Sequence, residues 1–378
     1  MTEDIMWLWF NNIDGIGLTS RLRIMSKLKN IDRVHEANKE QLQDILKNNQ
    51  INTFMNSKKD INKYIELKEK LMERNVWFVY PGHKDYPIKL YDIYEPPTLL
   101  YVKGNINNSI NSQNVNIAIV GSRKPSVYGS EMAMKFAKDL AGHGINIISG
   151  LASGIDSKAH CGSLLAGGYT IGILGCGINL TYPRENAELY AKISKNGAIL
   201  SEYGLDVGPV PGYFPMRNRL ISGLSDGVLV VEAKKKSGSL ITADYALEQG
   251  KQVYAIPGKL LDSNSEGTNN LIKEGAYLVT SYKDIMFDLT KQEEYKDSDI
   301  CSEQNSIRAS DEKKRVNKNF LAPIEKMVYS CLSLEPTYID DIIQTIGIGV
   351  TKTISVLYTM EEKGFIKQPV KGYYIISI

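Results

Sequence analysis

The chain has few residues of the kinds that build metal centres, disulfide frameworks or membrane spans. Its 378 residues include only four cysteines, scattered with no C-x-x-C pair, and only four histidines. We therefore expect no structural zinc site and no disulfides, and a reducing compartment fits this composition. No apolar run approaches the roughly 18 residues of a membrane helix, and the N-terminus carries Glu3 and Asp4 in place of a basic segment. We expect neither a signal peptide nor a membrane span, and we predict a cytoplasmic protein.

The chain also lacks a strong net charge. The formal charge is only +2, which excludes nucleic-acid binding through a basic field over the whole molecule and leaves a local patch as the alternative. The length is too great for one ordinary domain and allows two or three domains with their own cores.

Residues 116–258 are organised as short apolar segments that alternate with helix-like segments. The predicted strands are Asn116–Val120, Ile145–Ser149, Tyr169–Leu174, Ala198–Ser201, Gly227–Glu232 and Gln252–Ile256. The predicted helices are Gly129–Ala141, Ile155–Ala166, Glu185–Lys195, Arg217–Leu224 and Leu240–Gln249. Nearly continuous apolar strands in this alternation predict a parallel, doubly wound α/β sheet that binds its ligand at the carboxyl ends of the strands.

Small residues cluster where the first three of these strands end. The three loops are Gly121-Ser122-Arg123, Ser149 to Gly154, and Gly175-Cys176-Gly177. Such loops let backbone N–H groups and helix N-termini face an anion, and arginine offers a planar fork matched to phosphate. One glycine loop alone would favour a simple tight turn. Three of them at one sheet edge favour a phosphate site.

Two familiar phosphate-binding classes do not fit these loops. A dinucleotide-binding protein needs G-x-G-x-x-G after its first strand, where this chain has Gly-Ser-Arg-Lys-Pro, and no G-x-x-x-x-G-K-[ST] string of a P-loop occurs. The segment Phe214-Pro215-Met216-Arg217-Asn218-Arg219 indicates a longer ligand, because an aromatic face beside two arginines suits a base stacked next to its own backbone. The alternative is that Phe214 packs in the core and the arginines begin a solvated helix.

Three further groups of residues each allow more than one interpretation. Asp156 and His160 share a helix face, which allows a metal or acid–base site, but such a pair more often ties a helix to its loop. Ser237 and Ser239 open a helix and form either a further anion site or a plain N-cap. The basic run 234–236 before them is a solvated edge that can steer DNA.

Several strings together resemble the DNA-processing protein A family, also called DprA or Smf. They cover residues from about Tyr86 to Val279 and are Gly121-Ser122-Arg123, Ser149 to Asp156 with Ala159-His160, Gly175-Cys176-Gly177, Tyr182 to Asn186, Phe214 to Gly223, Val231-Glu232-Ala233, Ser237 to Ala243, and Ala255 to Gly258. Many independent strings in one order make the resemblance specific.

This resemblance implies a domain plan. Residues 1–75 would form a helical domain like a sterile alpha motif, and 76–288 an extended Rossmann-like domain that binds DNA. Composition predicts a flexible linker over 289–321. Three predicted helices and a hairpin over 322–378 have the order of a winged helix. Five lysines and six acidic residues give Pro323–Ile378 a net charge of −1, which favours a regulatory or protein-binding role over docking on phosphates.

The resemblance also implies a function. Family members bind single-stranded DNA without sequence preference, protect incoming DNA and load RecA recombinase in natural transformation, as homodimers joined through the sheet domain and without catalysis. We predict no catalytic residue, metal or cofactor. The residues predicted to contact DNA, as phosphate partners, hydrogen-bond donors or a stacking face, are Gly121, Ser122, Arg123, Gly150, Ser153, Gly154, Phe214, Arg217, Asn218, Arg219, Ser237 and Ser239.

One departure from the family and one alternative function remain. Relatives commonly carry a lysine just before the Phe-Pro step, where this chain has Val210-Pro211-Gly212-Tyr213, so DNA affinity is predicted to be modest unless the run 234–236 compensates. The alternative is a nucleotide-processing hydrolase of the phosphoribohydrolase group, for which Glu232 would be an acidic residue of the site. That group carries P-G-G-x-G-T, where this chain has Lys-Ser-Gly-Ser-Leu-Ile-Thr.

Overall fold

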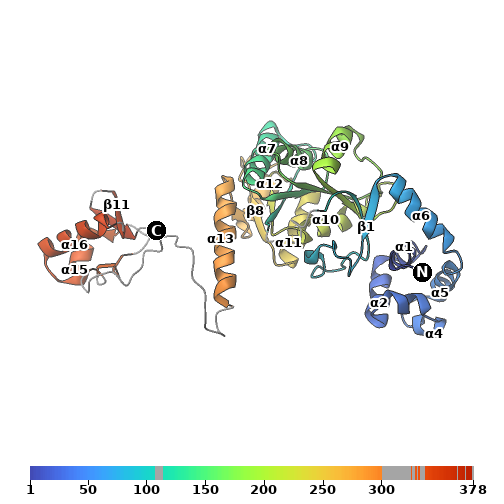
Figure 1. Cartoon of the computed structure of the whole chain (residues 1–378). Helices are drawn as coiled ribbons and strands as arrows, with labels where there is room; N and C mark the ends of the chain where they lie inside the picture. The colour runs from blue at the N-terminus through green and yellow to red at the C-terminus, as the bar shows by residue number, and fades with distance from the viewer. Residues whose placement is uncertain are drawn as a thin grey trace. The chain divides into compact units, whose positions relative to one another are not determined.

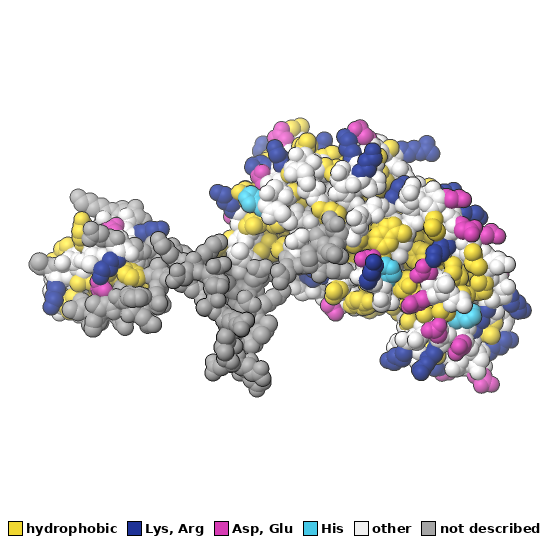
Figure 2. All heavy atoms as spheres, viewed as in Figure 1, with side chains coloured by type: hydrophobic (Ala, Val, Ile, Leu, Met, Phe, Trp, Pro, Cys, Tyr) yellow, Lys and Arg dark blue, Asp and Glu magenta, His cyan; other side chains and the backbone are white. Residues whose placement is uncertain are grey.

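The computed structural model describes residues 1–106, 114–299, 325, 328–329, 331–332, 337–363, 365–370 and 372–376. The chain divides into two compact units, Met1–Asp299 and Ile300–Ile378. Within the described residues, no helix is long and apolar enough to pass through a membrane. Basic and acidic side chains are interspersed over the first unit on the face drawn in Figure 2, in keeping with the small net charge.

The first unit opens with six helices, α1 (Glu3–Asn11), α2 (Leu18–Leu28), α3 (Ile31–Glu36), α4 (Lys39–Leu42), α5 (Asn48–Ser57) and α6 (Asn62–Glu73). Their apolar faces enclose Trp9, Phe10 and Phe54, which are fully buried. The same hydrophobic cluster continues into Val76 and Ile199 of the sheet. The predicted boundary at residue 75 thus lies between α6 and the first strand, but the helices pack on the sheet within one unit.

A nine-stranded sheet forms the centre of this unit (Figure 1). Its strands are β1 (Val76–Val79), β2 (Leu100–Gly104), β3 (Asn116–Val120), β4 (Asn146–Ser149), β5 (Thr170–Leu174), β6 (Gly197–Ser201), β7 (Gly227–Val230), β8 (Gln252–Ala255) and β9 (Tyr277–Leu278). The strand order is β1-β2-β6-β5-β4-β3-β7-β8-β9. The seven strands from β6 to β9 in this order are parallel, and β1 and β2 extend the β6 edge in antiparallel fashion.

Helices cover both faces of the sheet, as the nearly continuous apolar strands require. Ile117 and Ile119 of β3 pack on α7 (Val127–Gly142) and α8 (Ile155–Leu165), whereas Ala118 and Val120 pack toward α10 (Tyr213–Gly223) and α11 (Gly238–Glu248). The remaining helices are α9 (Ala187–Asn196), α12 (Glu266–Lys273), α13 (Tyr282–Asp299) and the short 3-10 turns η1 (Ile88–Leu90) and η3 (Arg184–Asn186). The predicted doubly wound α/β sheet is confirmed.

The order of strands creates a switch point at β3. The chain runs from β3 through β4 and β5 to β6 in one direction, and then returns to place β7 on the other side of β3. Loops that leave adjacent strands in opposite directions open a crevice outside the carboxyl ends of those strands, where ligands of such folds bind.

Two predicted segments differ from the structure. Helix α10 begins at Tyr213, four residues before the predicted start, because Pro215 is tolerated in a first helical turn and does not end the helix. Helix α13 continues to Asp299 and so includes the start of the predicted linker, while 300–324 lies outside the described residues.

The second unit contains α15 (Ile339–Ile346), α16 (Val350–Glu362) and a three-stranded antiparallel sheet of β10 (Thr337–Tyr338), β12 (Tyr373–Ile376) and β11 (Ile366–Val370). Ile342, Leu357 and Ile366 lie in its core. Two helices followed by a hairpin have the order of a winged helix. Of its predicted first helix, Ile324–Leu332, the structure describes only residues 325, 328–329 and 331–332.

Candidate nucleic-acid interface

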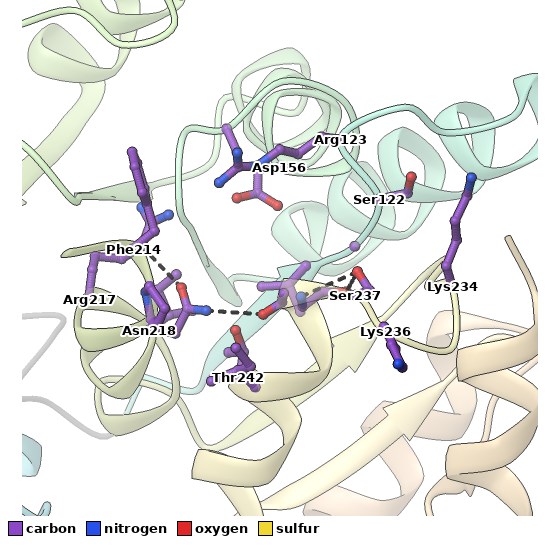
Figure 3. Close-up of a pocket in the computed structure, with 18 of the residues that line it drawn as sticks. Ser122, Arg123, Asp156, Phe214, Arg217, Asn218, Lys234, Lys236, Ser237 and Thr242 are labelled. Carbon is purple, nitrogen blue, oxygen red and sulfur yellow. Dashed lines mark hydrogen bonds between the residues drawn. The ribbon is translucent and has the colours of Figure 1, made fainter. Parts of the chain in front are cut away.

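A crevice of about 670 Å³ opens at the switch point of the sheet. Its walls come from the loops after β3, β4, β5 and β7, the start of α10 and the start of α11. Figure 3 shows Phe214, Arg217 and Asn218 of α10 on one side, with Lys234, Lys236 and Ser237 on the other. Segments that are far apart in the sequence thus meet at the edge where the sequence predicts a ligand.

The loop after β3 brings cations to this crevice. Gly121 has no room for a side chain, because a Cβ there would lie 2.8 Å from Ile155 Cγ1. The Ser122 hydroxyl accepts a hydrogen bond from the Lys124 N–H at 3.1 Å, which closes the turn. The exposed Arg123 guanidinium lies 5.2 Å from the centre of the Phe214 ring. Both Arg123 and Lys124 line the crevice.

The N-terminus of α7 begins beside the same loop but is filled by the chain itself. The buried Glu232 carboxylate accepts hydrogen bonds from the Ser126 N–H, at 2.9 Å, and from the Ser126 hydroxyl. A Cβ at Gly129 would lie only 2.3 Å from the carboxyl carbon of Glu232. The partial positive charge of this helix end is therefore neutralised internally, and α7 has no free N-terminus to offer a phosphate.

The loop after β4 contributes structure more than open donors. The Asp156 carboxylate accepts from the Gly150 N–H at 3.1 Å, and burial raises the pKa of this carboxyl while Arg217 opposes the shift. Gly154 has φ +83°, and a Cβ there would lie 2.4 Å from the Ser122 carbonyl oxygen, so its role is to let two loops pack together. The Ser153 hydroxyl donates to Glu185 at 2.6 Å.

Arg217 forms the floor of the crevice. Its Nη1 donates to the carbonyl oxygens of Gly150, at 2.5 Å, and Ile173, and its side chain is buried. Gly150 is required beneath it, because a Cβ there would lie 2.7 Å from the guanidinium. The Asn218 side chain accepts from Arg217 Nε at 3.2 Å and donates to the Gly238 carbonyl oxygen at 3.2 Å. Asn218 thus ties α10 to the start of α11.

The structure does not bring Arg219 to the crevice. It is buried, only 2% exposed, and its Nη2 lies 2.7 Å from the Glu202 carboxylate. Two residues along a helix turn by about 200°, so Arg217 and Arg219 necessarily point to different sides of α10. The expectation of two arginine forks side by side is corrected: one forms the floor and the other belongs to an internal ion pair.

The start of α11 forms the opposite wall. The Ser237 hydroxyl accepts from the Ser239 N–H at 3.4 Å and lies 2.8 Å from the Ser239 hydroxyl. Lys234 and Lys236 are exposed and line the crevice, as does Thr242 in the first turn of α11. Unlike α7, this helix end receives no carboxylate among the described hydrogen bonds and ion pairs.

The Asp156 and His160 pair is structural in this arrangement. The buried His160 Nδ1 lies 2.7 Å from the Thr170 hydroxyl, and burial lowers the pKa of its imidazole to about 3. Together with the Asp156 bond to Gly150, this contact ties α8 to β4 and β5. Across the described ranges, no group of three or more potential metal ligands occurs.

The predicted site residues divide into three sets. Those that line the crevice are Gly121, Ser122, Arg123, Phe214, Arg217, Asn218, Ser237 and Ser239. Gly150 and Ser153 line an adjoining cavity of about 60 Å³. Gly154 and Arg219 line neither. The crevice lining also includes Lys124, Tyr182, Lys234, Lys236 and Thr242, which are not among the predicted site residues, although Tyr182 lies in one of the family strings and all three lysines adjoin predicted loops.

Charge is distributed unevenly around the crevice. Its lining has five cationic side chains, Arg123, Lys124, Arg217, Lys234 and Lys236, and one acidic side chain, the buried Asp156. A doubly wound α/β protein with a cationic crevice at its switch point belongs to the class that binds phosphate-bearing ligands there.

Comparison with known proteins gives the family. Residues 77–290 match the family described as DNA recombination-mediator protein A. "DNA processing protein DprA" of Bacillus subtilis is 45% identical over 209 residues, which are 55% of this chain and 70% of that protein. The chain belongs to this DprA/Smf family of DNA-processing recombination mediators.

Two solved structures agree with this assignment. DNA processing protein A from Streptococcus pneumoniae is 34% identical with a TM-score of 0.65, over 76% of this chain and 98% of that one. DNA processing protein A from Helicobacter pylori, whose structure concerns its single-stranded DNA binding mode, is 32% identical with a TM-score of 0.52, over 57% and 96% of the two chains.

Proposed function

We propose that this protein binds single-stranded DNA without sequence preference in the crevice at the β3 switch point. The observation that carries the proposal is the lining of five cations with one buried acid. Among the described residues, no carboxylate forms an ion pair with Arg123, Lys124, Lys234 or Lys236. Exposed cations without acidic partners attract a polyanion, and their effect falls as salt rises.

An aromatic wall favours a single strand over a free phosphate. The Phe214 and Tyr182 rings line the crevice with centroids 5.6 Å apart. Unpaired bases stack on such rings whatever their identity, while phosphates follow the neighbouring cations. The two lysines of the loop after β7 stand on the wall opposite α10, and we infer that they supply the charge lost with the lysine that relatives carry before the Phe-Pro step.

The family assignment supports the wider role that we propose. In this role the protein protects incoming single strands and loads RecA recombinase on them during natural transformation, in the cytoplasm, as a homodimer joined through the sheet unit. Two crevices in one dimer would favour long strands through avidity. The test is RecA ATPase activity on DNA coated with single-strand-binding protein, which this protein should accelerate, and a lack of acceleration would contradict the loading role.

The hydrolase alternative has less support. Glu232, its acidic candidate, is buried under the N-terminus of α7 with both carboxylate oxygens engaged by Ser126. We therefore propose that the protein acts by binding and not by catalysis. Incubation with nucleoside monophosphates provides the test, because release of free base in proportion to the protein would overturn this part of the proposal.

The binding proposal is tested by titrating a fluorescent oligo-dT at several salt concentrations. Wild type should bind, and Arg123→Ala should bind more weakly and flatten the slope of log affinity against log salt by about 0.7, the value for one phosphate contact on a single strand. Lys195→Ala, at the end of α9 beside the amino end of β6, removes the same charge and should change neither quantity. Equal behaviour of Arg123→Ala and wild type would remove the crevice from consideration as the DNA site.

A further inference from the structure

The aromatic wall of the crevice contains two rings, those of Phe214 and Tyr182. Their centroids lie 5.6 Å apart and their planes are inclined by 36°. Tyr182 is 42% exposed, whereas Phe214 is partly buried. The two rings therefore do not offer equal surfaces to a base.

The Phe214 ring is already covered by protein. The Arg123 guanidinium carbon lies 5.2 Å from its centroid. Gly175, at the end of β5, is in contact with the ring as well, since a Cβ on that glycine would lie 2.9 Å from Phe214 Cδ1. With Tyr182 as a third neighbour, Phe214 has little open surface for a further aromatic layer.

Tyr182, in contrast, is held so that its ring faces outward. Its backbone carbonyl oxygen accepts a hydrogen bond from the Tyr190 hydroxyl at 3.0 Å, and its N–H donates to the same hydroxyl at 3.4 Å. Tyr190 belongs to α9 and is only 8% exposed. A buried anchor that fixes the backbone reduces the entropy lost when the exposed ring is ordered against a ligand.

We propose that Tyr182 is the residue on which a DNA base stacks, and that Phe214 and Arg123 form the layer that supports it. The inference rests on the proposed single-stranded DNA binding and assigns the stacking surface within that site. The Arg123 guanidinium then has two roles, because it lies against the Phe214 face and also stands at the crevice, where phosphates pass.

The assignment predicts an effect that depends on the base. Stacking contributes roughly 1 to 3 kcal/mol per base, so Tyr182→Ala should weaken binding of oligo-dT by about fivefold or more. It should not weaken binding of an abasic phosphodiester strand of the same length. The salt slope should stay unchanged for both strands, because no phosphate contact is lost.

Matched variants separate stacking from folding. Tyr182→Phe keeps the ring and should bind oligo-dT like wild type, and Tyr182→Leu keeps apolar bulk without a ring and should bind like Tyr182→Ala. Tyr94→Ala removes a 76% exposed ring outside the crevice and should have no effect. Thermal unfolding of each variant shows whether the fold is retained.

The outcomes distinguish this inference from the function on which it rests. If wild type binds oligo-dT and Tyr182→Ala binds it equally well, the stacking role of Tyr182 is wrong and the DNA site stands. If Tyr182→Ala and Tyr182→Leu weaken the two strands equally, Tyr182 only supports the local structure and the inference is again overturned. If wild type binds neither strand, the proposed function falls together with this inference.

Discussion

Ionisable side chains have opposite environments at the crevice and in the interior beneath it. At the crevice, Arg123, Lys234 and Lys236 are exposed and form no ion pair among the described residues. A few residues away, the buried Arg219 is paired with Glu202 and the buried His160 is held uncharged. The Arg219 pair lies just beyond the carboxyl end of β6, whereas His160 meets Thr170 at the amino end of β5.

The difference shows that a count of arginines and lysines does not locate a binding site. A charge that is removed from water must be paired or discharged, because its desolvation otherwise costs several kcal/mol. A charge that stays in water needs no partner and is free to meet a ligand. In this protein the cations available to bind a ligand are therefore those that form no ion pair with a buried carboxylate. Arg219 is not available, although it lies only two residues from Arg217.

The largest expected effect comes from breaking the internal pair. Arg219→Ala leaves the Glu202 carboxylate buried without its partner and should lower the free energy of unfolding by about 3 to 5 kcal/mol. Urea denaturation measures the loss. Lys192→Ala removes one partner of the exposed pair with Glu188 on α9 and should leave the transition unchanged. If Arg219→Ala unfolds at the same urea concentration as wild type, burial of the unpaired carboxylate does not determine the loss of stability.

The next effect concerns the uncharged histidine. The pKa of His160 is about 3 in the folded protein and about 6.5 in an unfolded chain. The unfolded state therefore binds more protons between these values, and stability that is complete above about pH 6.5 is lost as pH falls, by roughly 1.4 kcal/mol per pH unit.

Comparison with His160→Asn isolates this contribution. Asparagine can still reach the Thr170 hydroxyl but does not titrate, so the difference in unfolding free energy between wild type and variant should change with pH between 6.5 and 4.5. Urea denaturation at a series of pH values gives this difference. A constant difference across the range would mean that the histidine is protonated in the folded state.

A smaller effect is expected from the N-terminal caps of α7 and α11, of which only the second is open to the crevice. Ser126→Ala removes the cap of α7, whose hydroxyl accepts from the Gly129 N–H at 3.0 Å and donates to Glu232. It should cost about 1 to 2 kcal/mol of stability and leave DNA affinity unchanged. Ser237→Ala should cost less stability, because its hydrogen bond is 3.4 Å long, but should weaken DNA binding. Thermal unfolding and oligo-dT titration of both variants test these opposite effects on stability and DNA affinity. If both substitutions change stability and affinity in the same way, the prediction is wrong.

The smallest effect separates three adjacent lysines. Lys234→Ala and Lys236→Ala should each flatten the salt slope by about 0.7 and weaken oligo-dT binding about fourfold at physiological salt. Lys235→Ala is the matched control, because its side chain does not line the crevice and lies 4.0 Å from Glu266. Oligo-dT titrations at several salt concentrations measure both quantities. Equal effects of all three substitutions would indicate a diffuse field in place of individual contacts.

Local pattern explains how much of the fold could be predicted. The apolar segments define β3 to β8 within one or two residues at each end, because a parallel strand covered on both faces must be apolar along its whole length. The start of α10 was missed because Pro215 reads locally as a break, although a proline fits the first turn of a helix. The strand expected at Tyr277–Val279 corresponds to β9, which is only two residues long and exposed.

The sequence by itself determined the doubly wound sheet, the family and the edge at which small residues and cations gather, because each depends on patterns within short segments. Only the tertiary structure decided which of those cations remain available. Glu202 meets Arg219 and Glu232 meets Ser126 across 17 and 106 residues of chain, and Tyr190 of α9 anchors the backbone of Tyr182 beside the Phe214 ring. Such pairings depend on contacts between segments that only folding brings together, and no local pattern encodes them.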